Sequence, residues 1–163
     1  MRKEELLQNA ESYAWLHGLE ILGSLGDGTQ GMVWRVRDKG KLHQRALKIH
    51  ASIKAYRAEV AVYERLRPIF SLEGFNIPVM LRHDERWLAI ELGLVQPPYI
   101  LDFAQACLDW PPDFSEEVWE ETLQKWRDTY GDDWPRVQRL LSALEGLGIY
   151  YLDVHRRNIA LPT

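Results

Sequence analysis

The first half of the chain alternates between short apolar runs and turn residues, a pattern that predicts a sheet. Apolar positions recur with helical spacing over residues 4–17, and Gly18 follows the predicted helix. Three strands are then expected at 19–25, 32–37 and 45–49, the second of which alternates apolar and basic side chains. Because only short turns join these strands, they should pair as an antiparallel meander.

One helix and two more strands should complete this half. Residues 53–66 place apolar side chains on one face, and Pro68 follows the predicted helix end. Strands are expected at 77–81 and 87–92, on either side of a turn at 83–86. The first half is therefore expected to be a five-stranded antiparallel sheet with one packed helix.

The pattern changes after residue 92, where paired prolines predict a linker and loop region over residues 93–114. Ser115 can then cap a helix with one apolar face, formed by Trp119, Leu123, Trp126 and Tyr130 and ended by Gly131. A second helix should begin near Asp133, with Pro135 in its first turn. We expect an α+β chain with two parts, residues 1–92 and residues 93–163.

Composition narrows the class of protein. The chain has 163 residues, of which 46% are apolar and 27% charged, as in soluble globular proteins. Its net charge of −4 gives no general signal for binding nucleic acid or an anionic membrane. The single cysteine, Cys107, excludes an internal disulfide, and no apolar run has membrane-spanning length. We expect a cytoplasmic protein.

A glycine-rich segment carries the first chemical signal. Gly26, Gly28 and Gly31, with Val33 after them, form the pattern G-x-G-x-x-G-x-V between two predicted strands. Glycines with this spacing let a hairpin bring its backbone N–H groups close to phosphates, because no side chains block the approach. The alternative is a glycine-rich hairpin turn that binds nothing.

A strand-borne lysine follows 17 residues after Gly31. Lys48 has apolar neighbours, so a buried ammonium there should have an anionic partner, either a phosphate, a carboxylate or both. The alternative is that Lys48 reaches water from an edge strand. Glu59 and Glu64 lie on the next helix about 140° apart, so only one can face Lys48. Glu59 has the more apolar surroundings and is preferred, unless it is a solvated helix charge.

An acid and an amide near the end of the sequence carry the last signal. Asp153 and Asn158 are five residues apart, between two apolar runs. Asp153 could orient a hydroxyl and accept its proton, and Asn158 could ligate a divalent metal. The alternative is a polar surface turn between two short strands.

In this order the four elements resemble the protein-kinase-like superfamily. The resemblance implies a kinase-like N-lobe over residues 1–92, a reduced helical C-lobe over residues 93–163, and ATP and Mg²⁺ as cofactors. It also implies the role of each site residue. Gly26, Gly28, Gly31 and Val33 would cover the ATP phosphates, Lys48 would pair the phosphates with Glu59, the backbone at Glu91 and Gly93 would hold adenine as a hinge, Asp153 would be the catalytic aspartate, and Asn158 would ligate Mg²⁺.

The sequence also departs from that family. The usual His-Arg before the catalytic aspartate is Tyr151-Leu152, and His155 follows it as in aminoglycoside- and choline-kinase-like phosphotransferases. Lys48 and Glu59 are 59 − 48 = 11 residues apart, fewer than is usual, which keeps Glu64 open. Only five residues follow Asn158, so we expect the Asp-Phe-Gly aspartate to be missing and the catalytic rate to be greatly lowered.

Three functions stay open at this point. The first is an ATP-dependent phosphotransferase that transfers the γ-phosphate to a hydroxyl of a protein or a small molecule. The second is an inactive pseudokinase that binds nucleotide or a protein. The third is a truncated product that self-associates through an exposed apolar surface. The expected partners are accordingly a nucleotide, a protein that completes the C-lobe, or a second copy of the chain.

Overall fold

A computed structural model describes residues 1–162 and divides the chain into two compact units. The first unit comprises Met1–Arg67 and Pro78–Leu94, and the second comprises Pro68–Ile77 and the chain from Val95 onward. The segment Pro68–Ile77 thus belongs to the second unit, although the helix before it and the strand after it belong to the first. No helix in the described part of the chain combines the length and apolar character needed to cross a membrane.

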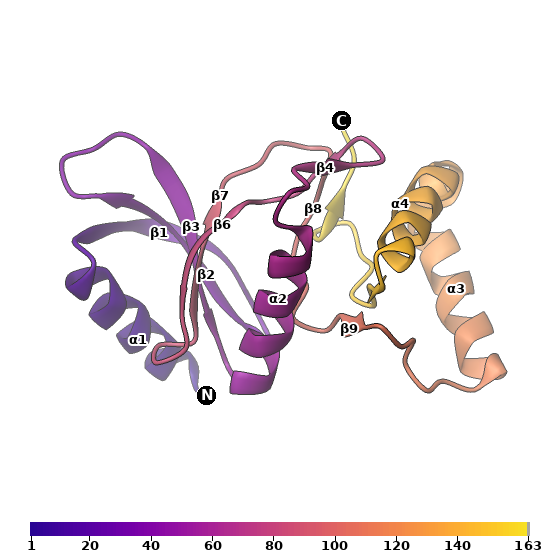
Figure 1. The fold of residues 1–163 in the computed structure, drawn as a ribbon, viewed down its shortest axis with the longest axis horizontal. Coiled ribbons are helices and arrows are strands. Elements are labelled where there is room, and N and C mark those ends of the chain that lie inside the picture. Colours follow the sequence, from indigo (N-terminus) through magenta and orange to yellow (C-terminus); the bar gives the residue numbers. More distant parts are fainter. Residues whose placement is uncertain (163) are drawn as a thin grey trace. The chain divides into compact units, whose positions relative to one another are not determined.

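The first unit is built on a five-stranded sheet, which confirms the expected mixed α+β class (Figure 1). Its spatial order is β1-β2-β3-β7-β6, and every neighbouring pair is antiparallel. The strands are β1 (Leu19–Gly28), β2 (Gly31–Asp38), β3 (Gln44–His50), β6 (Met80–Asp84) and β7 (Ala89–Gly93).

The boundaries of the last two strands differ from the prediction. The turn lies at residues 85–88 rather than 83–86, because the Asp84 side chain accepts the Arg86 N–H and thereby holds the start of the turn. The predicted strand at 77–81 begins only at Met80. Pro78 has no N–H to give to a sheet, and the Ile77 N–H donates to the Phe70 carbonyl in the second unit.

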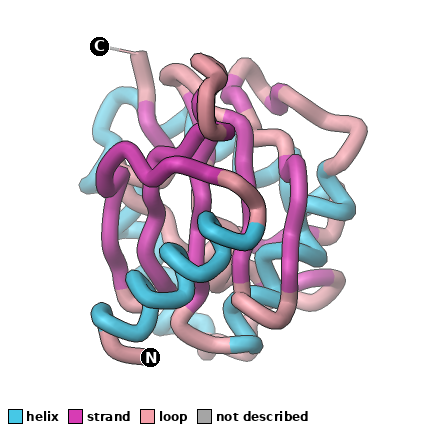
Figure 2. The backbone as a smooth tube through the Cα atoms, turned by 90° about the vertical axis from the view of Figure 1, so that its left-hand side faces the viewer, coloured by secondary structure: helices cyan, strands magenta, loops and turns pink. Residues whose placement is uncertain are grey.

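Helix α1 (Lys3–Leu16) lies across one face of this sheet (Figure 2). Leu6, Ala10, Tyr13 and Ala14 form its buried stripe, and they join a cluster that includes Trp34, Leu47 and Ile49. The buried stripe of α1 therefore packs against the inward-facing side chains of β3 in one core. Such packing is the usual source of stability for so short a helix.

Helix α2 (Ile53–Leu66) lies on the opposite side of the sheet from α1 (Figure 1). Ser52 caps it, since the Ser52 hydroxyl accepts the Ala55 N–H at 3.2 Å. Successive side chains of a strand point to opposite faces. Because Leu47 and Ile49 face α1, Lys48 and His50 face α2, and this alternation positions the candidate site.

The second unit combines small sheets with two helices. The helices are α3 (Glu116–Tyr130) and α4 (Trp134–Gly146), separated by a single 3₁₀ turn, Gly131–Asp133. One sheet has the order β11-β8-β5-β4, formed by β4 (Ser71–Leu72), β5 (Phe75–Asn76), β8 (Tyr99–Ile100) and β11 (Ile159–Ala160). A second pairs β9 (Cys107–Leu108) with β10 (Ile149–Tyr150).

The predicted loop region at 93–114 therefore contains two short strands, β8 and β9, which the sequence analysis missed. Each has only two residues, too few to show an alternation of apolar and polar side chains. They form because partners distant in sequence supply their hydrogen bonds, β11 for one and β10 for the other.

Candidate functional site

The glycine segment forms the end of the β1–β2 hairpin. Gly28 pairs with Gly31 across a two-residue connection, and Gly26 pairs with Val33. The Gln30 carbonyl at the tip accepts the Ala51 N–H at 2.8 Å, which ties the hairpin to the end of β3. The hairpin tip is therefore attached to the sheet on one side, while Gly26 and Gly28 stay exposed.

The three glycines serve different purposes. Gly31 has a φ of +155°, and a Cβ there would collide with the Ile49 carbonyl oxygen of the adjacent strand. Within the first unit as described, a Cβ at Gly26 or Gly28 would meet no atom within 4 Å. Of these three positions, only position 31 needs glycine for the fold. The other two glycines leave the hairpin backbone bare, as close approach by a ligand would require.

Strand register places the hairpin beside the lysine. Val33 is paired with Lys48, and Gly31 is paired with His50. Lys48 is only 4% exposed, and its Nζ lies 2.6 Å from Glu59 Oε2. Glu59 is fully buried, whereas Glu64 is exposed. Of the two glutamates considered from the sequence, Glu59 is thus the one that pairs with Lys48.

The charge on Glu59 is maintained by its neighbours. Burial by itself raises the pKa of this carboxyl, but the Lys48 charge and the interaction with His50 outweigh that effect and lower the pKa to about 2. Glu59 is consequently ionised at neutral pH. A buried ion pair of this kind is costly to form and more costly to break, because removal of one partner leaves a charge without compensation.

His50 is a member of this cluster that the sequence analysis missed. Its side chain is fully buried, with Nε2 2.5 Å from Glu59 Oε2 and Nδ1 3.0 Å from the Leu88 carbonyl oxygen. One signal could have found it: a residue two positions after Lys48 on the same strand must share its face.

The two predicted hinge residues take part in the sheet. Glu91 pairs with Leu47 on β3 and with Arg82 on β6, and the Gly93 N–H donates to the Val79 carbonyl at 2.9 Å. The Glu91 side chain is buried on the α1 face of the sheet. These contacts give both residues a structural role and lend no support to the expectation that their backbone holds adenine.

In the second unit, Asp153 and Asn158 lie together in one loop. Asn158 Nδ2 donates to Asp153 Oδ2 at 2.8 Å and contacts the Asp153 carbonyl oxygen at 3.2 Å. The backbone carbonyl of Asn158 accepts the Leu101 N–H at 2.8 Å, and the Tyr130 hydroxyl donates to the backbone carbonyl of Ile159 at 3.0 Å. The loop is thereby held by β8 on one side and by the end of α3 on the other.

His155 completes this loop. Its Nδ1 accepts the Arg157 N–H at 3.2 Å, so its proton is on Nε2, which lies 3.5 Å from Asp153 Oδ1. Both oxygens of the Asp153 carboxylate therefore face N–H groups, one from Asn158 and one from His155. These contacts orient the carboxylate, whose side chain is 28% exposed.

The loop offers oxygen ligands of the kind that Mg²⁺ prefers. The Asn158 amide uses its nitrogen on Asp153, which leaves its oxygen as the atom suited to a metal. Among residues 1–162 no group of three His, Cys, Asp or Glu side chains could hold a metal ion. Mg²⁺ typically keeps several waters and adds phosphate oxygens to one or two protein ligands, so the side-chain oxygen of Asn158 fits such a role.

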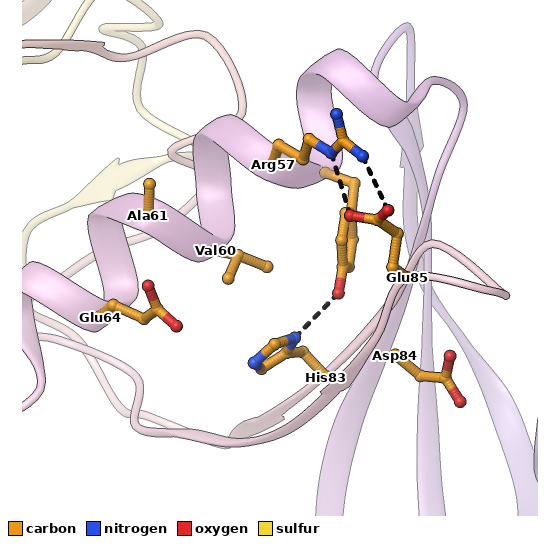
Figure 3. A pocket seen from close by; sticks show the side chains of 8 residues that line it. Arg57, Val60, Ala61, Glu64, His83, Asp84 and Glu85 are labelled. Carbon is orange, nitrogen blue, oxygen red and sulfur yellow. Dashed lines mark hydrogen bonds and ion pairs between the residues drawn. The ribbon is translucent and has the colours of Figure 1, made fainter.

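A separate pocket lies in the first unit between α2 and the β6–β7 turn (Figure 3). It has a volume of about 430 Å³, and its rim carries the Arg57–Glu85 ion pair, with contacts of 3.0 and 2.8 Å. Burial and the nearby carboxylates raise the pKa of Tyr56 to about 12, and its hydroxyl lies 2.8 Å from His83 Nδ1. Of the glutamates considered from the sequence, only Glu64 lines this pocket.

No protein-family model matches this chain, and no curated protein matches it. The interpretation of the site accordingly rests on its residues and on their geometry.

Proposed function

We propose that this chain is a protein-kinase-like phosphotransferase that binds ATP with Mg²⁺ and transfers the γ-phosphate to a hydroxyl acceptor. The observation that carries the proposal is the buried 2.6 Å ion pair between Lys48 and Glu59, which lies beside the glycine hairpin. Glu59 orients the ammonium, and the ammonium can attract a phosphate of the nucleotide.

The hairpin supports the same function. Bare backbone at Gly26 and Gly28 allows N–H groups to approach phosphate oxygens. Gly31 lets β2 lie close against β3, and this close packing sets the hairpin beside Lys48. The glycines and the lysine would then act on one triphosphate.

The loop of the second unit would supply the chemistry. The acceptor oxygen forms a bond to the γ-phosphorus while the bond from that phosphorus to the bridging oxygen of ADP breaks. Asp153 accepts the proton of the acceptor hydroxyl. Asn158 would hold Mg²⁺, which neutralises phosphate charge when bound. Either a protein or a small-molecule hydroxyl fits this chemistry.

The test is thermal melting with and without Mg²⁺–ATP on wild type, Lys48→Ala and the matched control Lys54→Ala. Lys54 is an exposed lysine of α2. A ligand at 100 times its dissociation constant stabilises by about 2.7 kcal/mol, which is easily detected. Each variant is compared with its own melting temperature without ligand. Wild type and Lys54→Ala should shift and Lys48→Ala should not, and a wild type that shows no shift would contradict the proposal.

The second candidate function is nucleotide binding without turnover. It is favoured by the Asp153 carboxylate, because both of its oxygens already face N–H groups of its own loop. The melting shift shows whether the chain binds nucleotide. The release of ADP then distinguishes a phosphotransferase from a protein that binds nucleotide without turnover. A chain that shifts with Mg²⁺–ATP but releases no ADP with any hydroxyl acceptor or water would be a binding module.

A further inference from the structure

The connection between β2 and β3 presents a leucine to solvent next to two lysines. Leu42 is 87% exposed, and Lys39 and Lys41, which precede it, are exposed as well. The last turn of α1 lies beside this connection, because the Lys39 N–H donates to the Gly18 carbonyl at 3.0 Å. Trp15, in that turn, is 79% exposed.

These side chains lie at the end of the sheet away from the glycine hairpin (Figure 1). None of them belongs to the candidate site. They form a surface that we call the basic patch, which consists of Trp15, Leu16, Lys39, Lys41 and Leu42.

The charge of the basic patch is positive because the acidic side chains around it already have partners. Asp38 accepts a hydrogen bond from the buried Arg45 at 2.9 Å, and Glu20 accepts one from Arg37 at 2.8 Å. Lys41 lies 3.8 Å from the same Asp38 carboxylate. More cations than carboxylates are therefore gathered at this end of the first unit.

A surface of the opposite charge lies in the second unit. Residues 110–121 contain five acidic side chains, all of them exposed, and no basic one. Trp110 is 79% exposed, and Phe114 and Val118 are exposed too. We call this surface the acidic patch, which consists of Trp110, Phe114, Glu117, Val118 and Glu121.

The first turns of α3 hold the acidic patch in place. Glu117 and Val118 both precede Glu121 by about one helical turn, so the three side chains share one side of the helix. Phe114 packs against Trp119 with ring centroids 5.3 Å apart, which fixes the chain where it enters the helix. A surface that is ordered in advance loses less conformational entropy when it binds a partner.

Helix capping explains only part of the acidic patch. Glu117 lies in the first turn of α3, where a carboxylate stabilises the helix without any partner. Glu121 lies beyond that turn, and Trp110 precedes the cap at Ser115 by five residues. Single exposed apolar residues are normal, but apolar residues grouped on one surface are typical of a site that binds a partner.

We propose that the basic patch of one chain binds the acidic patch of a second copy of the same chain. Each patch exposes a tryptophan with aliphatic neighbours, so burial of apolar surface and Coulomb attraction would act together. Contact between two patches of the same kind would bring like charges together and is disfavoured. Neither patch contains a residue of the candidate site, so this self-association is independent of nucleotide binding.

The first test is sedimentation velocity of the intact chain, without nucleotide, over a series of protein concentrations. We expect the average mass to rise with concentration. The association should weaken between about 0.1 M and about 1 M salt, because the Debye length falls from about 10 Å to about 3 Å. A chain that stays monomeric at every concentration would overturn the proposal, also if its basic patch instead binds vesicles of an anionic phospholipid.

Charge reversal tests whether these two patches are the ones that meet. Lys39→Glu/Lys41→Glu removes the positive charge of the basic patch, and Glu117→Lys/Glu121→Lys removes the negative charge of the acidic patch. We expect each variant alone to be monomeric, because its two patches then have like charge, and an equimolar mixture of the two to associate.

Lys54→Glu and Glu145→Lys reverse exposed charges outside both patches and should associate as wild type does. Circular dichroism checks that every variant is folded. Association of either double variant alone, or a mixture of the two folded variants that stays monomeric, would overturn the proposal.

The apolar members of the patches allow a test that leaves every charge in place. Leu42→Ser and Trp110→Ser change side chains that are almost fully exposed, so the fold should tolerate them. We expect the dissociation constant of self-association to rise about tenfold or more in each variant. An unchanged dissociation constant in both would overturn the proposal.

Discussion

The Tyr13 hydroxyl donates a 2.6 Å hydrogen bond to Glu91 Oε1, which joins the first helix to a strand 78 residues further along the chain. The other oxygen of Glu91 accepts from Arg45, and Arg45 also pairs with Asp38 at 2.9 Å. Burial and the neighbouring carboxylate raise the pKa of Tyr13 well above its usual range, so its hydroxyl remains a donor. A polar network thus links α1 to the sheet, within an interface that is otherwise apolar.

Replacement of Tyr13 by Phe should test this network. The change keeps the ring in the core but removes the hydroxyl that donates to Glu91 Oε1, while Arg82 Nη1 stays 3.7 Å from that oxygen. We expect the free energy of unfolding to fall by about 1–3 kcal/mol. Urea denaturation measures it. Tyr150→Phe is the matched control, since Tyr150 is half-buried in the second unit. Equal stability of Tyr13→Phe and wild type would show that the hydrogen bond adds nothing.

Because Gly31 and Gly28 have different roles, replacement by alanine should affect different properties at the two positions. Gly31→Ala should lower stability by about 1–3 kcal/mol, because its φ is +155° and its Cβ would meet the Ile49 carbonyl. Gly28→Ala should leave stability within about 0.5 kcal/mol but weaken nucleotide binding. Chemical denaturation and the Mg²⁺–ATP melting shift measure the two effects. Equal loss of stability in both variants would refute the distinction.

The ion pair at Glu59 predicts how stability depends on acid. The pKa of this carboxyl is lowered from 4.5 to about 2 in the folded chain. Between these values the unfolded state binds more protons, so the stability contributed by ionised Glu59 is present above pH 4.5 and is lost as the pH falls towards 2. We expect that loss to be on the order of a few kcal/mol.

Glu59→Gln supplies the comparison. It leaves Lys48 and His50 without their carboxylate, and we expect it to be less stable at neutral pH by about 3–5 kcal/mol. Its stability should then fall less between pH 4.5 and 2 than that of wild type. Glu64→Gln, which changes an exposed residue of the same helix, should behave as wild type. The experiment is urea denaturation at a series of pH values, and parallel curves for all three proteins would contradict the prediction.

Asp153→Asn separates the proposed base from the nucleotide site. We expect transfer or hydrolysis of the γ-phosphate to fall by about 10²–10⁴-fold, because amide oxygen is a poor proton acceptor. The melting shift with Mg²⁺–ATP should persist. ADP release measures turnover, and Asp132→Asn, at an exposed position, is the control. Unchanged turnover in Asp153→Asn would remove Asp153 from the role of base.

Long periodic segments were predictable from sequence. The helix predicted at 53–66 has those bounds in the structure, and Ser115 and Gly131 bracket α3 as expected. Spacing also placed Lys48 near a helix carboxylate, although it left two candidates. The choice of Glu59 required the rotation of α2 about its axis, which depends on packing against β3 and β6.

The sequence by itself determined the helices, the meander and the residue types of the site, because local spacing specifies which side chains share a face. Only the tertiary structure decided that Gly31 lies against β3, that His50 joins Lys48 and Glu59, and that Tyr13 reaches Glu91. These contacts join residues 9 to 78 positions apart in sequence. They depend on strand register and on helix docking, which arise when the whole sheet buries its two faces together.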